Sequence, residues 1–334
     1  MLLNDLIAGL SVEPIGPGRP PVRICDLTED SRTVLPGSLF IARSGAKSDG
    51  RRFIADAVKA GAVAVLTDRT AARALEGTRE VGPAILLTSE DLALASALLA
   101  ERFWGEPSAR LISAAVTGTN GKTTIAWLFW QLLNALNVRC GLIGTVAIDD
   151  GREVAPADMT TPPAIELSRT LASMLDAGCR AFAMEASSHS LDQRRVAALK
   201  FHAAIFTNLT RDHLDYHNSM EAYADAKARL FETLAPSGVA IVNCDDPAHA
   251  RMIRRCPARV VRCGIGQRGE GLDAAVRISS ATLQGMKLAL EGPWGDWSVT
   301  VPLIGAYNAM NVLQALAAAH ECLGRAGVAA VGPR

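Results

Sequence analysis

Residues 117–124 read Thr-Gly-Thr-Asn-Gly-Lys-Thr-Thr, and this stretch decides which fold we expect. An apolar run at 111–116 precedes it, and apolar residues at helical spacing follow it between 125 and 136. A phosphate-binding loop requires a buried strand, a glycine turn and a helix in succession. We therefore predict such a loop here, within an α/β fold.

Each part of this loop suits a polyphosphate. Gly118 and Gly121 allow a tight turn that points backbone N–H groups at phosphate oxygens, near the positive end of the helix. Lys122 adds a cation for the terminal phosphates, and the Thr123 hydroxyl suits a bound Mg²⁺. A standard loop of this class has a glycine where this chain has Val116, so the pattern is a shortened GxxGKT. The alternative, a plain turn followed by a solvated lysine, fits the flanks less well. The candidate ATP-binding residues of the loop are Gly118, Thr119, Asn120, Gly121, Lys122, Thr123 and Thr124.

Bulk composition limits the class of protein. A length of 334 residues suggests about two domains. Zero formal net charge and 5% aromatic residues give no reason to expect a nucleic acid or a membrane surface as partner. No apolar run approaches the roughly 20 residues of a membrane span, and the first residues lack a basic signal-peptide start. Seven scattered cysteines without a CxxC pair suit reduced thiols. We expect a cytoplasmic protein and a monomer.

The sequence predicts an N-terminal domain at 1–107, a central domain at 108–326 and a linker at 327–334. The turn at Gly105-Glu-Pro107 marks the first boundary. The clearest α/β elements of the N-terminal domain are a helix at 53–60, a strand at 62–66 and a helix at 91–104.

From residue 111 onward, short apolar strands alternate with helices, which favours a mainly parallel sheet wrapped by helices. The expected strands are 111–116, 141–148, 181–184, 203–206, 239–243 and 259–263, and the expected helices are 123–136, 165–177, 220–234 and 306–323. Residues 276–303 differ, because alternating stretches at 286–290 and 297–303 are split by Gly292-Pro293. We expect appended antiparallel strands there.

Polar clusters follow two of the expected strands, at the sheet edge where ligands of open α/β folds gather. Glu185 follows the strand at 181–184 and suits Mg²⁺, which takes one or two carboxylates when it is bound to a nucleotide. The loop at 207–217, which includes His213, contains two histidines, two aspartates and an arginine. The alternative for Glu185 is a surface acid at a helix start, and the alternative for the segment at 207–217 is a solvated loop. By residue type alone, Lys227 is an ordinary solvated lysine on a helix.

Other short sequence motifs lie outside the phosphate loop and the two polar clusters. They are Asp30-Ser31-Arg32, Pro36-Gly37-Ser38-Leu39-Phe40, Asp49-Gly50-Arg51, Thr160-Thr161-Pro162, residues 187–196, and Gly305-Ala-Tyr-Asn-Ala-Met-Asn311. Over about residues 26–323 the chain resembles the Mur ligases, ATP-dependent enzymes that form amides in peptidoglycan precursor synthesis. The resemblance is strongest to the members that add the third peptide residue to UDP-N-acetylmuramoyl-L-alanyl-D-glutamate. It implies an α/β UDP-binding domain followed by a P-loop central ATPase domain.

The resemblance also implies substrate contacts. In the N-terminal domain, Ser31 and the loop 46–48 would touch the UDP part, and residues of the central domain would hold the muramoyl dipeptide. The substrate-binding residues that it implies are Ser31, Ala46, Lys47, Ser48, Thr160, Thr161, Ser187, Gln193 and Arg195.

A catalytic set follows from the same resemblance. Lys227 matches a lysine that CO₂ converts to a carbamate, an anion with metal-binding oxygens, and this step requires a neutral amine and hence a depressed pKa. The implied Mg²⁺ ligands are Thr123, Glu185, His213 and carbamylated Lys227, and the implied catalytic residues are Lys122, Lys227, His213 and Glu185. Asn308 and Asn311 match residues near the adenine, although helix-capping asparagines would give the same pattern.

The implied reaction transfers a phosphoryl group from ATP to the D-glutamate γ-carboxylate, and an amine of a diamino acid then attacks the acyl phosphate. The partners are thus UDP-N-acetylmuramoyl dipeptide and either meso-diaminopimelate or lysine. Family members continue into a third domain of about 150 residues that binds the amino acid. We therefore expect these 334 residues to bind ligands without completing the ligation at a useful rate. A folate polyglutamate synthase would lack the uridine-binding runs, and a P-loop GTPase would carry an NKxD motif that is absent here.

Overall fold

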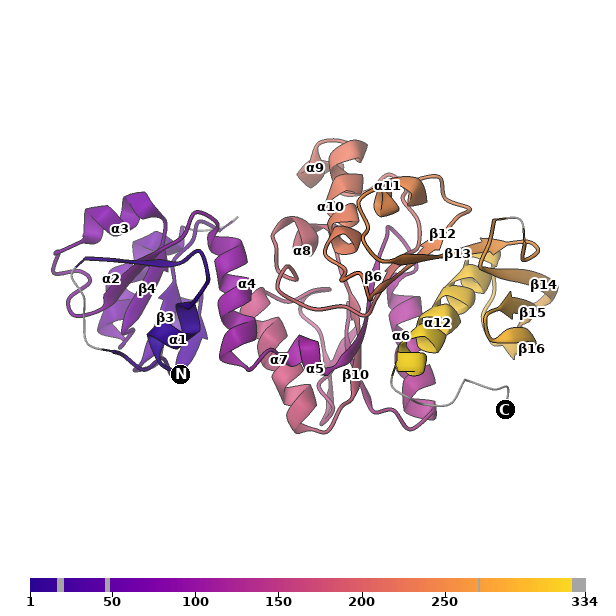
Figure 1. The fold of residues 1–334 in the computed structure, drawn as a ribbon, viewed down its shortest axis with the longest axis horizontal. Helices are drawn as coiled ribbons and strands as arrows, with labels where there is room; N and C mark the ends of the chain where they lie inside the picture. Colours follow the sequence, from indigo (N-terminus) through magenta and orange to yellow (C-terminus); the bar gives the residue numbers. More distant parts are fainter. Residues whose placement is uncertain (17–20, 46–48, 270, 326–334) are drawn as a thin grey trace. The chain divides into compact units, whose positions relative to one another are not determined.

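The computed structural model describes residues 1–16, 21–45, 49–269 and 271–325. The chain forms two compact units, whose elements are labelled in Figure 1. Unit 1 comprises Met1–Glu106 and Pro163–Arg169, and unit 2 comprises Pro107–Pro162 and Thr170–Arg334. Each unit contains its own sheet and its own hydrophobic core.

Unit 1 is built on a five-stranded sheet in the order β1-β5-β4-β3-β2. Strands β2 to β5 pair in parallel, and β1 pairs antiparallel with β5. The strands are β1 (Glu13–Ile15), β2 (Asp26–Thr28), β3 (Ser38–Ile41), β4 (Ala64–Thr67) and β5 (Ile85–Thr88). The helices are α1 (Leu3–Ile7), η1 (Ser31–Thr33), η2 (Gly50–Phe53), α2 (Ile54–Lys59), α3 (Arg69–Leu75) and α4 (Leu92–Phe103).

The elements expected in unit 1 are confirmed as α2, β4 and α4. Helix α4 begins where an N-cap is available, because the Asp91 carboxylate accepts a hydrogen bond from the Leu94 N–H at 2.9 Å. Buried apolar residues, including Leu27, Leu39 and Leu66, then close the core between the sheet and the helices.

Unit 2 contains an eleven-stranded sheet in the order β16-β15-β14-β13-β12-β11-β6-β10-β7-β8-β9. Its middle, from β14 to β7, is parallel, and both of its edges are antiparallel. The strands are β6 (Ile112–Thr117), β7 (Cys140–Ile143), β8 (Ala147–Asp149), β9 (Val154–Pro156), β10 (Ala181–Glu185), β11 (Ala203–Phe206), β12 (Val239–Asn243), β13 (Arg259–Ile265), β14 (Ala274–Thr282), β15 (Gly285–Gly292) and β16 (Gly295–Val301). The predicted α/β class, with a mainly parallel sheet and appended antiparallel strands, is confirmed.

Helices surround this sheet. They are α5 (Pro107–Arg110), α6 (Lys122–Ala135), α7 (Ala164–Asp176), α8 (Ser188–Asp192), α9 (Leu214–His217), α10 (Met220–Glu232), α11 (His249–Ile253) and α12 (Ala306–Arg325). The four helices expected in the central part are thus confirmed as α6, α7, α10 and α12. Apolar residues of α6 and α12, such as Phe129 and Leu313, share one core cluster with strand residues such as Ile205, and Figure 1 shows the two helices together beside the sheet. Both helices begin at segments that the sequence assigns to the nucleotide.

One expected strand is wrong. Residues 141–148 form two antiparallel strands, β7 and β8, instead of one. The chain reverses where the Gly144 N–H donates to the Ala147 carbonyl at 3.1 Å. A Cβ at Gly144 would lie 2.6 Å from Glu185 Oε1, so the missing side chain makes room for that carboxylate. A long-range contact of this kind leaves no mark on local hydrophobic periodicity.

The antiparallel region is larger than expected. Strand β15 covers the predicted stretch 286–290, and β16 covers 297–303 only as far as Val301. Strand β14, at Ala274–Thr282, was not anticipated. Its first three residues are buried and the remaining six are exposed, so it shows no alternation. Pairing with β15 stabilises it instead.

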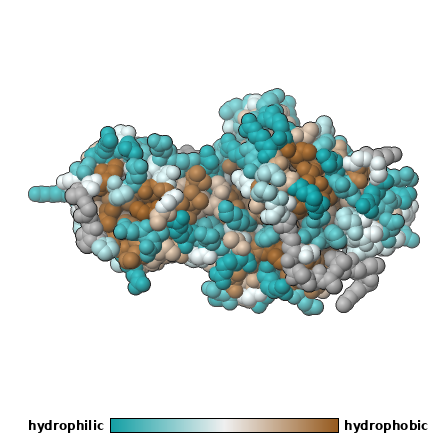
Figure 2. Space-filling model, viewed as in Figure 1, coloured by the Kyte–Doolittle hydropathy of each residue, from teal (hydrophilic) through white to brown (hydrophobic). Residues whose placement is uncertain are grey.

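In the part of the chain that the structure describes, no helix is both long and apolar enough to cross a membrane. Figure 2 shows hydrophilic and hydrophobic residues interspersed on the face that it draws. Scattered apolar residues of this kind are normal on protein surfaces and mark no site by themselves.

Candidate active site

The loop between β6 and α6 has the turn geometry that the sequence predicts. Gly118 and Gly121 have φ of 149° and 88°, a region that favours glycine. A Cβ at Gly118 would collide with the Thr207 hydroxyl, and one at Gly121 would lie 2.7 Å from Asn311 Oδ1. Helix α6 starts at Lys122, so its first N–H groups lie at the end of this loop, as anion binding requires.

The segment after β11 holds this loop in place. The Thr119 N–H donates to the Asn208 carbonyl at 2.8 Å, and the Asn120 N–H donates to Asn208 Oδ1 at 3.0 Å. The Asn208 side-chain amide donates to the Asn120 carbonyl at 3.1 Å, and the Thr207 hydroxyl donates to the same carbonyl at 2.6 Å. Sequence reasoning assigned no role to Asn208. Its position directly after a buried strand was the signal that could have found it.

Lys122 is folded back onto its own loop. Its Nζ donates to the carbonyls of Gly118 and Thr119, at 3.0 and 2.9 Å. Burial lowers the pKa of Lys122, and the nearby charges of Glu185 and Asp212 oppose that shift. To reach a phosphate, the ammonium group must exchange these carbonyl contacts for phosphate oxygens.

Lys227 is buried, so its interpretation as a solvated lysine is wrong. It is 1% exposed, its Nζ donates to the Gly118 carbonyl at 2.9 Å, and that Nζ lies 4.3 Å from the centroid of the Tyr223 ring. Burial, followed by the charge of Lys122, lowers the pKa of Lys227 to about 6, against an opposing effect of Asp212. The amine is therefore largely neutral at neutral pH, which is the form that reacts with CO₂.

Glu185 ends strand β10 and is fully buried, so it is not a surface acid at a helix start. Its Oε2 accepts hydrogen bonds from the hydroxyls of Thr123 and Thr145, both at 3.0 Å. Its Oε1 accepts the Thr145 N–H at 2.8 Å. The structure thus brings together two of the four expected Mg²⁺ ligands, Thr123 and Glu185.

A pocket of about 400 Å³ adjoins this carboxylate. Its lining residues are Thr145, Asp158, Met159, Thr160, Thr161, Ser187, His189, Arg195 and His213. Four expected substrate-binding residues, Thr160, Thr161, Ser187 and Arg195, therefore line one cavity together with the expected metal ligand His213. Sequence reasoning did not single out Thr145 or His189.

Arg195 is held rigidly in this pocket. Its Nε and Nη2 donate to Gln193 Oε1 at 3.1 and 2.7 Å, and its Nη1 donates to the Thr161 carbonyl at 2.6 Å. The Thr161 hydroxyl in turn donates to the Glu185 carbonyl at 2.8 Å. In this structure Gln193 therefore orients the guanidinium of Arg195. The expected direct contact of Gln193 with substrate stays a prediction.

Histidine and tyrosine rings pack beside the pocket. The His189 ring centroid lies 4.9 Å from that of His213, 4.2 Å from that of Tyr216 and 5.6 Å from that of His217. Burial is the largest cause that lowers the pKa of His189 and of His217. His213 itself has a left-handed backbone, with φ of 51°, and its Nε2 lies 3.5 Å from Asp212 Oδ2.

The donor chemistry here fits a nucleotide-bound Mg²⁺. In the described ranges, which leave out 17–20, 46–48, 270 and 326–334, no three His, Cys, Asp or Glu side chains form a metal-binding group. An Mg²⁺ ion on a nucleotide needs fewer protein ligands, because phosphates and water complete its octahedron. One buried carboxylate beside one hydroxyl, Glu185 and Thr123, is such a set.

The two asparagines expected near the adenine lie in the first turns of α12. Asn311 Nδ2 donates to Asn308 Oδ1 at 3.0 Å, and Asn308 Nδ2 donates to the Ile304 carbonyl at 2.9 Å. The proximity of Asn311 to Gly121 brings the start of α12 against the phosphate loop. Their role toward adenine stays a prediction.

In unit 1, the expected UDP-binding residue Ser31 begins η1 and is half-buried. The turn before it is fixed by Asp30, whose carboxylate accepts the Arg32 N–H at 3.0 Å and pairs with the Arg32 guanidinium. Ala46, Lys47 and Ser48 lie outside the described residues.

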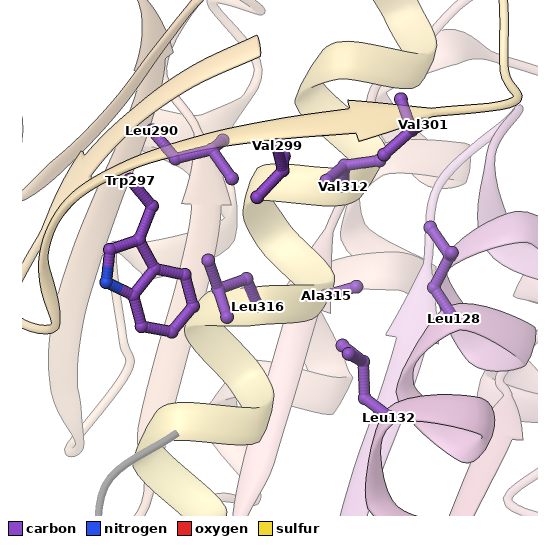
Figure 3. A pocket seen from close by; sticks show the side chains of 9 residues that line it. All are labelled: Leu128, Leu132, Leu290, Trp297, Val299, Val301, Val312, Ala315 and Leu316. Atoms are coloured by element: carbon purple, nitrogen blue, oxygen red, sulfur yellow. The ribbon is translucent and has the colours of Figure 1, made fainter. Parts of the chain in front are cut away.

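A second cavity, of about 190 Å³, lies between α6, α12, β15 and β16 (Figure 3). Its lining residues are Leu128, Leu132, Leu290, Trp297, Val299, Val301, Val312, Ala315 and Leu316. A wall of apolar side chains offers no partner to phosphates or carboxylates, so this cavity is not the candidate active site.

Comparison with known proteins places this geometry in a family. Residues 116–319 match the Mur ligase middle domain, and residues 24–102 match the domain described as Mur ligase family, catalytic domain. The chain belongs to the Mur ligase family, a family of ATP-dependent ligases, and the resemblance drawn from its motifs is confirmed.

Within this family, the chain is similar to ligases of one named activity. The chain is 41% identical to the UDP-N-acetylmuramoyl-L-alanyl-D-glutamate–2,6-diaminopimelate ligase of Chlorobium phaeobacteroides, over 95% of this chain and 62% of the relative. A solved structure of a ligase with the same name is 31% identical, with a TM-score of 0.75, over 91% of this chain and 60% of that chain. The MurF ligase of Thermotoga maritima in complex with ADP has the same fold, at 18% identity and a TM-score of 0.59, over 93% and 64% of the two chains. The chain thus spans about 62% of the length of the first of these relatives.

Proposed function

We propose that this chain binds ATP and UDP-N-acetylmuramoyl-L-alanyl-D-glutamate for the ligation of 2,6-diaminopimelate, the amine named in its relatives. One observation carries the proposal. The pocket lined by Thr161, Ser187 and Arg195 is joined through Glu185 to Thr123 of the phosphate loop. A substrate carboxylate in the pocket and the phosphates on the loop would therefore meet at Glu185.

The nucleotide end of the site rests on α6 and its loop. N–H groups at the start of α6 would bind the phosphates, and Lys122 would exchange its two carbonyl contacts for phosphate oxygens. Lys122 would then stabilise the charge that develops on the transferred phosphoryl group. Asn308 and Asn311 would lie toward the adenine.

Thr123, Glu185, His213 and carbamylated Lys227 would hold Mg²⁺. When bound, the ion supplies the charge neutralisation that phosphoryl transfer requires. Lys227 suits carbamylation because its buried amine is largely neutral, and the product would place an anion near the Lys122 ammonium. The carbamate nitrogen keeps one N–H, so it could still donate to the Gly118 carbonyl while the two new oxygens face the metal.

Each unit has its own expected substrate-binding residues. Ser31, with 46–48, would bind the UDP part. In unit 2, Arg195 would orient the substrate carboxylate that receives the phosphoryl group, with Gln193 fixing the guanidinium. The acyl phosphate must then be kept from water until the amine attacks it.

We predict that replacing Arg195 with lysine weakens binding of UDP-N-acetylmuramoyl-L-alanyl-D-glutamate about tenfold, or about 1.4 kcal/mol. A lysine has one point charge in place of a planar fork, so it cannot keep the contacts to Gln193 and Thr161 while it binds a carboxylate. Calorimetric titration of both proteins measures the effect. Arg254→Lys, an exposed change on the same unit, is the matched control. Equal affinities in all three proteins would remove Arg195 from the substrate site.

The chain spans about 62% of the length of its relative from Chlorobium phaeobacteroides, so ligation by these 334 residues is a separate question. Holding an amine against an acyl phosphate contributes roughly 7–11 kcal/mol to catalysis, and we propose that the family's third domain provides it. Incubation with ATP, Mg²⁺, the UDP-muramoyl dipeptide and diaminopimelate should yield no tripeptide by mass spectrometry. Turnover near roughly 1 s⁻¹ would show that these residues suffice.

A further inference from the structure

The turn between β7 and β8 holds the Glu185 carboxylate at two points. The Thr145 N–H donates to Oε1 at 2.8 Å, and the Thr145 hydroxyl donates to Oε2 at 3.0 Å. Adjacent backbone and side-chain donors on one residue fix both the position and the rotation of a carboxylate. Gly144 leaves the space for this contact, since a Cβ there would lie 2.6 Å from Oε1.

Thr145 also reaches the substrate pocket. Its hydroxyl oxygen lies 3.1 Å from that of Thr160, and both residues line the cavity. A hydroxyl has a single proton but two lone pairs. When the Thr145 proton is donated to Glu185, Thr160 can donate to Thr145. Thr160, Thr145 and Glu185 then form a line of hydrogen bonds from the pocket to the carboxylate.

The other side-chain donor to Glu185 is Thr123, on the phosphate loop, at 3.0 Å. Thr123 is itself an expected ligand of the cation, so its hydroxyl would serve both the cation and Glu185. Thr145 lies outside the phosphate loop, so its two contacts to Glu185 come from a different segment of the chain. A buried carboxylate that lost both hydroxyls would retain one backbone donor, at a substantial desolvation cost.

We infer that Thr145 is a positioning residue, which holds Glu185 in the orientation that receives the divalent cation of the nucleotide and links that carboxylate to Thr160. The inference rests on the proposed function, because it presupposes a metal–nucleotide complex at Glu185. Thr145 acts through Glu185 and contacts neither the phosphates nor the cation.

Metal binding by the 334-residue chain tests this role, with Mn²⁺ as the probe. Free Mn²⁺ is counted by electron paramagnetic resonance with AMP-PNP, a non-hydrolysable ATP analogue, at a concentration equal to that of the protein. A protein-free titration gives the Mn²⁺ that the nucleotide binds by itself, and this is subtracted. Thr145→Val removes the hydroxyl at nearly constant shape and should weaken Mn²⁺ binding about tenfold, since a hydrogen bond to a charged group is lost while the backbone donor stays. Thr145→Ser retains the hydroxyl and should stay within about threefold of the wild type. Metal-free AMP-PNP affinity should be unchanged in both, which a general loss of structure would not allow.

Thr300→Val, on the exposed face of β16, is the matched control and should leave Mn²⁺ binding unchanged. Thr145→Ala provides the second test of the hydroxyl should the valine variant not fold. Unaltered Mn²⁺ binding in Thr145→Val or Thr145→Ala, or equal losses in Thr145→Ser and Thr145→Val, would overturn the inference. So would a wild-type chain that binds AMP-PNP but no Mn²⁺.

Titration with UDP-N-acetylmuramoyl-L-alanyl-D-glutamate separates this result from the proposed function. If the wild type binds Mn²⁺ with AMP-PNP but no UDP-muramoyl dipeptide, the proposed function fails. The order of the Thr145 variants in Mn²⁺ binding would then still support the positioning role.

Discussion

Replacing Lys122 with alanine should weaken binding of Mg²⁺–AMP-PNP by about tenfold to a hundredfold. Hydrogen bonds to a charged group are worth roughly 1.5–3 kcal/mol, and the variant loses the ammonium that would contact the terminal phosphates. The unliganded fold should tolerate the change, because Lys227 also donates to the Gly118 carbonyl. Calorimetric titration measures the affinity directly.

Lys287→Ala is the matched control for this change, since Lys287 is exposed on β15. It should bind nucleotide as the wild type does. If Lys122→Ala also keeps the wild-type affinity, the segment at 117–124 is a plain turn and its lysine has no part in nucleotide binding.

Replacing Lys227 with methionine should flatten the pH dependence of stability. The pKa of Lys227 is about 6 in the fold and 10.5 for an unperturbed lysine. Between these two values the unfolded chain binds more protons than the folded chain, so the free energy of unfolding rises with pH. Relative to Lys227→Met, the wild type should gain up to about 1.4 kcal/mol per pH unit within that window, and nothing further above it. Urea denaturation in CO₂-free buffer at several pH values measures the difference.

Lys287→Met is the control for this measurement, because its exposed amine should leave the slope unchanged. Parallel stability curves for the wild type and Lys227→Met would mean that Lys227 is a normally titrating lysine. Carbamylation has an independent readout. After equilibration with ¹³C-bicarbonate, the wild type should show a carbamate carbon resonance that Lys227→Met lacks.

The phosphate loop was predictable because its chemistry is local. A strand, two glycines, a lysine and a threonine lie within a few residues, and the structure keeps them together at the start of α6. The parallel sheet followed from similar local patterns. The family assignment, too, came from short runs such as Thr160-Thr161-Pro162, and the comparisons confirm it.

What the sequence could not reveal depends on contacts between distant residues. The residues around Lys227 have the composition of a surface helix, yet its side chain contacts the carbonyl of Gly118, 109 positions away. Thr145 was not identified because it falls within residues 141–148, which were wrongly predicted to be one strand. The turn that contains Thr145 contacts Glu185, 40 positions later in the chain. Asn208 was missed because the loop at 207–217 was interpreted through its titratable residues, and an asparagine does not titrate. Hydrophobic periodicity reports which face of an element is buried, not which distant group it meets.

The central claim is that one chain holds a nucleotide and a UDP-muramoyl dipeptide in joined sites. Its most direct test is calorimetric titration of the 334-residue chain with UDP-N-acetylmuramoyl-L-alanyl-D-glutamate at saturating Mg²⁺–AMP-PNP, compared with UDP alone. We predict saturable binding of one ligand per chain, at least about tenfold tighter than that of UDP, because the pocket around Arg195 adds contacts to the peptide carboxylate. No saturable binding, or an affinity equal to that of UDP, would contradict it.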